Sequence, residues 1–265
     1  MVVISKIDVI LFNGEQIIEI RIPYLYNSVD YFLIVESRET HSGKIKDILY
    51  YESNYFKNFF NKYIDKIKFI IIDKFPEITN EWKNSRIDNY MNSSSYESWF
   101  KENYQRNYAI EFLKEYEPYV ATICDVDEIP DKFIYSISYN NCNNPIALEM
   151  KFYYYSFRWI KKELWTSAFI INDIGIKKYK DLSYCRTLKN KMGMVKNAGW
   201  HCSYFLSPED IIRKLESFAH RECDQIEFKK KEHVLNSINN GIDLFNRGPN
   251  ENLLENTEIP EPFLL

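Results

Sequence analysis

The segment Tyr119-Val-Ala-Thr-Ile-Cys-Asp-Val-Asp-Glu-Ile-Pro130 decides the fold, because an apolar run passes directly into three acidic residues. Residues 119–124 predict a buried strand, and Pro130 ends the pattern. In open α/β sheets, ligands bind beyond the carboxyl ends of such strands. Asp125 and Asp127 are two residues apart, so on a continuing strand both carboxylates point to one face. Two carboxylates this close repel each other unless a cation lies between them.

A hard cation such as Mg²⁺ or Mn²⁺ prefers oxygen ligands, keeps several waters and takes phosphate oxygens as further ligands. The acidic cluster therefore predicts a metal-assisted site for a nucleotide diphosphate. The plainer interpretation is a turn without a ligand, since acidic residues are common where strands end. The buried strand in front of the acids favours the ligand site.

Short apolar runs alternate with helical patterns on both sides of this segment. The further strand candidates are residues 7–12, 31–35, 67–72 and 147–157. A helix is expected over residues 94–117, where Ser94 and Glu97 form a capping box and Pro118 ends the pattern. A second is expected over residues 207–220, which begin with Ser207 and Pro208. A third pattern, over residues 15–26, is interrupted by Pro23. Strands separated by helices imply parallel crossovers. We predict one α/β domain over residues 1–247, with a mostly parallel sheet flanked by helices, and an irregular tail over 248–265.

Composition excludes several classes of protein. The chain is 45% hydrophobic with a net charge of −4, so it can bury a core and offers no broad basic surface for nucleic acid. No run approaches the roughly 18 apolar residues of a membrane helix. The five cysteines have no CxxC spacing, which predicts free thiols rather than a zinc site.

Two motifs, Asp125-Val-Asp-Glu-Ile-Pro130 and Gly199-Trp-His-Cys-Ser-Tyr204, together resemble glycosyltransferase family 17, the family of the bisecting β-1,4-N-acetylglucosaminyltransferases of N-glycans. Further blocks resemble the family in the same order: residues 8–13, 19–21 and 29–37, then Thr40, Gly43 and Lys44, then Trp99, Glu102, Gln105, Arg106 and Asn107, then residues 218–220, 241–244 and Arg247. The resemblance implies a Rossmann-like fold of the GT-A type, UDP-N-acetylglucosamine as donor, a glycan hydroxyl as acceptor and inversion at the anomeric carbon.

The resemblance also bears on the site residues. Asp125 and Asp127 are the expected ligands of Mn²⁺ or Mg²⁺, and His201 is implied as a third ligand by the late histidine of GT-A enzymes. The expected donor-binding residues are Glu36, Ser37, Lys44, Arg106, Asp125 and Trp200. Arg106 shares a helix face with Glu102, so the two form either a surface ion pair or a partly buried pair near the diphosphate. Trp200 either stacks on a sugar or fills the core.

Inverting transfer needs a general base for the acceptor hydroxyl. The expected base is Glu209 or the adjacent Asp210, with Glu128 and Asp173 as rivals. Acids in the first turn of a helix also favour the helix dipole without any catalytic role.

Two other functions compete: a carbohydrate-binding module without turnover, and a phosphatase of the haloacid dehalogenase type, which normally has Thr or Ser where Glu128-Ile129-Pro130 stands. The abundance of Ile, Lys, Asn and Tyr fits an AT-rich genome and predicts a microbial or viral origin. The lack of an apolar membrane segment, unlike the anchored animal members of the family, predicts a soluble cytoplasmic protein. The Golgi lumen is the alternative if a membrane anchor has been removed.

Overall fold

The computed structural model describes residues 3–264 apart from 81, 83–94, 189–190, 192, 249–250 and 252. The first half contains β1 (Ser5–Leu11), α1 (Ile18–Leu25), β2 (Tyr31–Ser37), α2 (Asn54–Phe60), β3 (Ile67–Ile72), α4 (Tyr96–Leu113), β4 (Tyr119–Asp125) and β5 (Glu128–Pro130). The second half contains β6 (Ile146–Leu148), β7 (Lys151–Tyr154), β8 (Ser156–Ile160), β9 (Phe169–Asn172), α5 (Asp173–Tyr179), α6 (Leu182–Thr187), β10 (Met194–Val195), β11 (Gly199–Ser203), α7 (Pro208–Ser217), α8 (Lys231–Asn240) and β12 (Leu254–Glu255).

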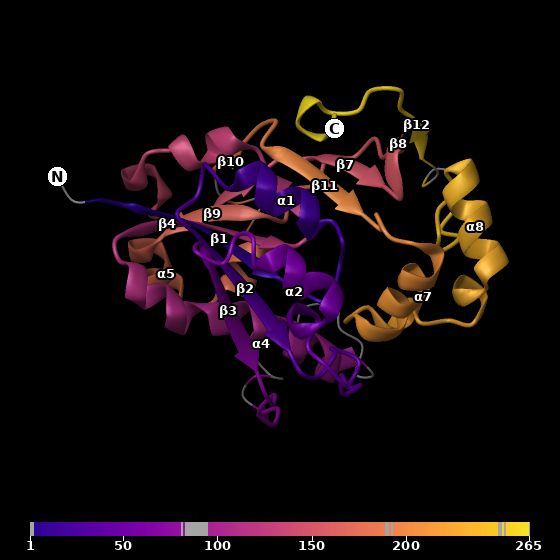
Figure 1. Cartoon of the computed structure of the whole chain (residues 1–265), viewed down its shortest axis with the longest axis horizontal. Coiled ribbons are helices and arrows are strands. Elements are labelled where there is room, and N and C mark those ends of the chain that lie inside the picture. Colours follow the sequence, from indigo (N-terminus) through magenta and orange to yellow (C-terminus); the bar gives the residue numbers. More distant parts are fainter. Residues whose placement is uncertain are drawn as a thin grey trace.

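The strands form two mixed sheets rather than one mostly parallel sheet (Figure 1). The larger sheet has the order β10-β6-β9-β4-β1-β2-β3, in which β10 and β6 are parallel and the run from β4 to β3 is parallel throughout. β9 is antiparallel to both of its neighbours. The smaller sheet has the order β12-β8-β7-β11-β5, in which only β7 and β11 are parallel. The prediction of an α/β fold is thus confirmed, but two mixed sheets, of which the larger is mainly parallel, replace the single mostly parallel sheet that was predicted.

Alternating residues of the parallel strands bury both faces of the larger sheet, as their apolar runs predicted. In β2, Phe32 and Ile34 pack toward α1 and α2, while Leu33 and Val35 pack toward α4, α5 and α6. The helix expected at 15–26 begins at Ile18 and continues through Pro23 to Leu25.

The strand predicted at 147–157 divides between the two sheets. β6 belongs to the larger sheet, and the chain then crosses to β7 and β8 of the smaller one. Ser94 lies outside the described residues, so its capping role stays a prediction. The tail contains the short strand β12, which pairs with β8, and the buried ring of Phe263. α7 and α8 lie together at one end of the molecule (Figure 1).

Candidate active site

Residues 125–128, called the acidic turn below, lie where the chain passes from the larger sheet to the smaller one. β4 ends at Asp125, in register with Leu11 at the end of β1, and β5 begins at Glu128 and pairs with β11. A cavity of about 840 Å³ opens at this edge. Its walls come from both sheets and from α4, α6 and α7. The carboxyl ends of β1 and β4 therefore meet a cavity, as the strand pattern predicted.

Arg21 of α1 hydrogen-bonds to the backbone of this turn. Its side chain is fully buried and forms a fork with Asp8 of β1, with Nε and Nη2 at 2.9 and 2.7 Å from the two carboxylate oxygens. Its Nη1 donates to the carbonyl oxygens of Asp125, Val126 and Glu128 at 2.8, 3.1 and 2.7 Å. One guanidinium thus contacts three carbonyl oxygens where the chain turns from β4 into β5.

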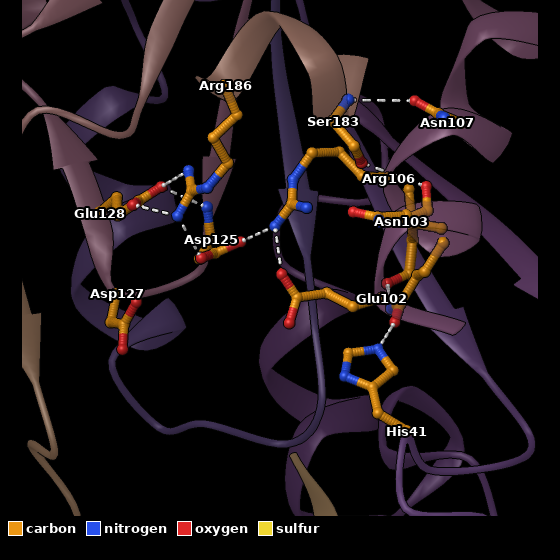
Figure 2. Close-up of polar contacts among 12 residues, drawn as sticks. His41, Glu102, Asn103, Arg106, Asn107, Asp125, Asp127, Glu128, Ser183 and Arg186 are labelled. Carbon is orange, nitrogen blue, oxygen red and sulfur yellow. Dashed lines mark hydrogen bonds and ion pairs between the residues drawn. The ribbon is translucent and has the colours of Figure 1, made fainter. Parts of the chain in front are cut away.

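Two arginines bind the carboxylate of Asp125 (Figure 2). Arg106 of α4 approaches one oxygen to 2.8 Å, and Arg186 of α6 approaches the other to 2.6 Å. Arg186 also forms a fork with Glu128, at 2.6 and 2.9 Å. Burial opposes ionisation of Asp125, but the two guanidinium groups lower its pKa to about 2. Because Arg106 is buried and contacts Asp125, the Arg106–Glu102 pair belongs to the site and not to the surface.

Asp127 has different cationic partners. Lys214 of α7 lies 3.0 Å from one carboxylate oxygen, and Nε2 of His201 on β11 lies 3.6 Å from the other. Burial opposes ionisation here as well, yet Lys214 and His201 hold the pKa of Asp127 well below its ordinary value. The rings of His201, Phe152 and Trp165 pack together, with the His201 centroid 4.6 Å from that of Phe152 and 4.2 Å from that of Trp165.

The predicted metal ligands do not converge on one point. Asp125 faces two arginines, and Figure 2 shows Asp127 turned away from Arg186. Each carboxylate already has its own cationic partners. Within the described part of the chain, no group of three or more His, Cys, Asp or Glu side chains could hold a metal ion. This arrangement does not fit a ready-made Mn²⁺ or Mg²⁺ site.

The other end of the cavity is built from α4 and the segment after β2. His41 hydrogen-bonds through Nε2 to Oε1 of Gln105 at 2.7 Å, and Gln105 donates to the carbonyl of Val35 at 2.8 Å. Burial lowers the pKa of His41, which favours the neutral ring. Trp99 lies beside His220, with centroids 4.7 Å apart. This end therefore offers a neutral imidazole and flat aromatic surfaces to a ligand.

Several residues predicted for the site do not line the cavity. Glu36 is fully buried and accepts hydrogen bonds from the backbone of Tyr50 and Tyr51, and the Ser37 hydroxyl donates to the carbonyl of Glu39. Lys44 pairs with Glu216 at the surface.

Trp200 and the two predicted bases also lie elsewhere. Trp200 packs in the core against Tyr24 and Phe263, so the core alternative is the one that the structure contains. Glu209 is exposed and pairs with Lys231 at 2.5 Å. Asp210 pairs with Arg213 at 2.8 Å, in the first turn of α7.

Sequence reasoning singled out Arg106 but missed the other basic residues that contact the acidic turn. Arg186 and Lys214 lie 61 and 87 residues after the carboxylates that they bind, in segments without any recognisable motif. Arg21 carried a weak signal, because an arginine in an otherwise apolar helical stripe must find a buried partner.

Comparison with known proteins identifies the family. The model of glycosyltransferase family 17 matches residues 4–256. The chain belongs to this family. The resemblance drawn from the two motifs is thereby confirmed, and the family is one of glycosyltransferases, the enzyme class predicted from the sequence. No solved structure gives a significant match.

Curated relatives of this family 17 chain are mammalian. The beta-1,4-mannosyl-glycoprotein 4-beta-N-acetylglucosaminyltransferases of Rattus norvegicus and Homo sapiens are each 24% identical to it, over 243 and 247 residues. The alignments cover 80% and 81% of this chain but 42% and 43% of the relatives, so the chain spans less than half of their length.

These relatives correct one expectation. They come from rat, human and mouse, and the prediction of a microbial or viral cytoplasmic protein is therefore wrong. Among the helices that the structure describes, none is both long and apolar enough to cross a membrane.

Proposed function

We propose that this chain transfers N-acetylglucosamine from UDP-N-acetylglucosamine to a glycan hydroxyl, with inversion at the anomeric carbon. The observation that carries the proposal is the cavity at the ends of β1 and β4, beside the acidic turn of a family 17 chain. The names of the relatives describe N-acetylglucosaminyltransferases that act on a mannosyl-glycoprotein. The parallel run from β4 to β3 is consistent with the nucleotide-binding half of a GT-A fold.

The charges of the cavity suit a diphosphate leaving group. As the bond to the sugar breaks, negative charge grows on the diphosphate, and fixed cations in a water-poor site stabilise it strongly. Lys214 and Arg186 line the cavity from two different helices and are held in place by Asp127 and Asp125. Burial opposes protonation of Lys214, but Asp127 and Glu15 raise its pKa above the ordinary value, so it stays cationic.

The aromatic wall suits a sugar. Phe152, Tyr154 and Trp165 line the cavity on the side of the smaller sheet. Ligand sites of this kind combine apolar and aromatic walls with a few placed polar groups that fix orientation. We infer that the donor sugar lies along this wall, with its diphosphate toward Lys214.

UDP release and sugar transfer test the proposal directly. The protein is incubated with UDP-N-acetylglucosamine and, in parallel, with other UDP-sugars, each with and without a mannose-containing glycan acceptor. Acceptor-dependent release of UDP from UDP-N-acetylglucosamine is the expected result. Parallel arms with Mn²⁺, Mg²⁺ and EDTA test the predicted metal dependence separately. Free phosphate as the product would instead indicate a phosphatase, and sugar binding without turnover a carbohydrate-binding module.

Asp127→Ala is the matching variant. It leaves Lys214 without its anchor at the cavity wall, so we expect transfer to fall by roughly a hundredfold or more. Asp73→Ala is the control, since Asp73 pairs with Arg38 on the exposed surface. Equal transfer by both variants would exclude the acidic turn from the site.

A further inference from the structure

The proposed transfer needs a proton acceptor within reach of the sugar, and the two acids expected for this role lie outside the cavity. Five carboxylates line the cavity instead: Glu15, Glu102, Asp125, Asp127 and Glu222. A carboxylate that is already neutralised by a bound cation is a poor base, because the cation stabilises its ionised form. The partners of these five carboxylates therefore decide which of them can accept a proton.

Three of the five have an arginine or lysine in direct contact, and a fourth, Glu222, is half exposed and hydrogen-bonds to the ring of His220. Their pairs are Asp125 with Arg106 and Arg186, Asp127 with Lys214 and His201, Glu102 with Arg106, and Glu222 with His220. Asp125 and Asp127 moreover have pKa values below the ordinary one. The three carboxylates with arginine or lysine partners serve better to hold cations than to take protons, and the Glu222 side chain is 52% exposed to solvent rather than enclosed by the site.

Glu15 differs from the other four. One of its carboxylate oxygens accepts a hydrogen bond from the backbone N–H of Asn13 at 2.9 Å, and within the described part of the chain it forms no ion pair. The preceding Gly14 has a φ of +86°, and a Cβ there would lie 2.6 Å from the ring of Tyr50. The turn after β1 can thus bend closely under Tyr50 only with glycine, and this bend delivers Glu15 to the cavity wall.

We propose that Glu15 is the general base of the transfer, an inference that rests on the proposed function. The acceptor's hydroxyl oxygen forms a bond to the anomeric carbon while the bond from that carbon to the diphosphate breaks. The nucleoside diphosphate leaves with the bonding electron pair, and the hydroxyl proton passes to the carboxylate of Glu15. Lys214, which lines the same cavity and interacts electrostatically with Glu15, is placed to stabilise the leaving group.

The surroundings of Glu15 support this assignment. The charged or titratable groups that face it are Lys214 of α7, Asp127 of the acidic turn, and Lys46 and Tyr50 of the segment after β2. Burial raises the pKa of Glu15 despite the opposing effect of Lys214. A carboxyl group with a raised pKa lies closer to the ideal for a base that works near neutral pH.

Glu15→Gln tests the proposal, because the amide keeps the shape and can still accept the hydrogen bond from Asn13. We expect kcat for transfer to fall by about 10²- to 10⁴-fold, while the affinity for UDP-N-acetylglucosamine, measured by calorimetry, changes less than about threefold. Glu15→Asp, which keeps the charge but withdraws it by one methylene, is expected to retain intermediate activity. Glu19→Gln is the control, since it makes the same change four residues later at a position that does not line the cavity.

The outcomes separate the two proposals. Transfer by Glu15→Gln within about threefold of the natural protein, or an equal loss in Glu19→Gln, overturns the role of Glu15 and leaves the proposed function standing. A natural protein that transfers no sugar from any nucleotide sugar overturns both. A loss of donor affinity as large as the loss of kcat would show that Glu15 binds the donor and is not the base.

Discussion

Replacing Arg21 by Met should remove the support of the acidic turn and destabilise the whole fold. Arg21 and Asp8 are both fully buried, so the substitution leaves a carboxylate in the core without its cation. It also removes the donor for three carbonyl groups of the turn. Breaking a buried ion pair by removing one partner costs about 3–5 kcal/mol. Because small domains are stable by only about 5–15 kcal/mol, this is a large share of the total.

Arg38→Met is the matched control. Arg38 also contacts an aspartate, Asp73, with its Nε 2.8 Å from a carboxylate oxygen, but the two side chains are 45% and 80% exposed. Exposed pairs of this kind contribute about 0–1 kcal/mol. The two variants therefore remove the same chemical group, from a buried fork with three further carbonyl contacts at Arg21 and from an exposed ion pair at Arg38.

Urea unfolding at pH 7, followed by far-UV circular dichroism, gives the free energy of unfolding of both variants. We expect Arg21→Met to lose at least about 2 kcal/mol more than Arg38→Met. Adding Asp8→Asn to Arg21→Met should restore part of this loss, because the stranded charge is then removed. Equal losses in Arg21→Met and Arg38→Met would refute the reasoning, since burial of the pair would then contribute nothing.

Two further predictions concern the acidic turn and its neighbours. Gly199→Ala should destabilise the protein by several kcal/mol in the same assay, because Gly199 has a φ of +143° and a Cβ there would lie 2.1 Å from the carbonyl oxygen of Ile129. Gly193→Ala is the control and should change stability little, since a Cβ there would lie in ordinary contact, 3.7 Å from the side chain of Ile146. Against the effect of burial, two arginines lower the pKa of Asp125 to about 2, so the folded state takes up this proton less readily than the unfolded state. Stability should therefore fall as the pH drops from roughly 5 to 2, and Asp125→Asn should flatten that decline; an unchanged slope would contradict it.

Local sequence patterns were sufficient for most of the elements. The apolar runs gave β2, β3 and β4 to within two residues, since an almost wholly apolar run of this length is typical of a strand covered on both faces. Ser207 and Pro208 marked the start of α7, where the Ser207 hydroxyl accepts a hydrogen bond from the backbone of Asp210. The motifs of the acidic turn and of β11 gave the family.

The pairing of distant segments was not accessible in this way. Periodicity shows which face of an element is buried but not which strand lies beside it, so the antiparallel β9 and the division of residues 147–157 between two sheets went unpredicted. The same limit applied to the candidate base. Glu209 had the right residue type after the right motif, yet α7 turns it to solvent and brings Lys214 to the cavity instead.

The sequence by itself determined that three acids follow a buried strand and that the chain belongs to a family of glycosyltransferases. Only the tertiary structure decided how those acids are neutralised: Arg186 and Lys214 reach Asp125 and Asp127 across 61 and 87 residues of chain. Among the described residues, it also placed Glu15 at the cavity wall without an ion pair. The physical reason is that the local spacing of apolar residues indicates which side chains of an element are buried. The partner of a buried charge depends on which segments the whole fold brings within about 3 Å.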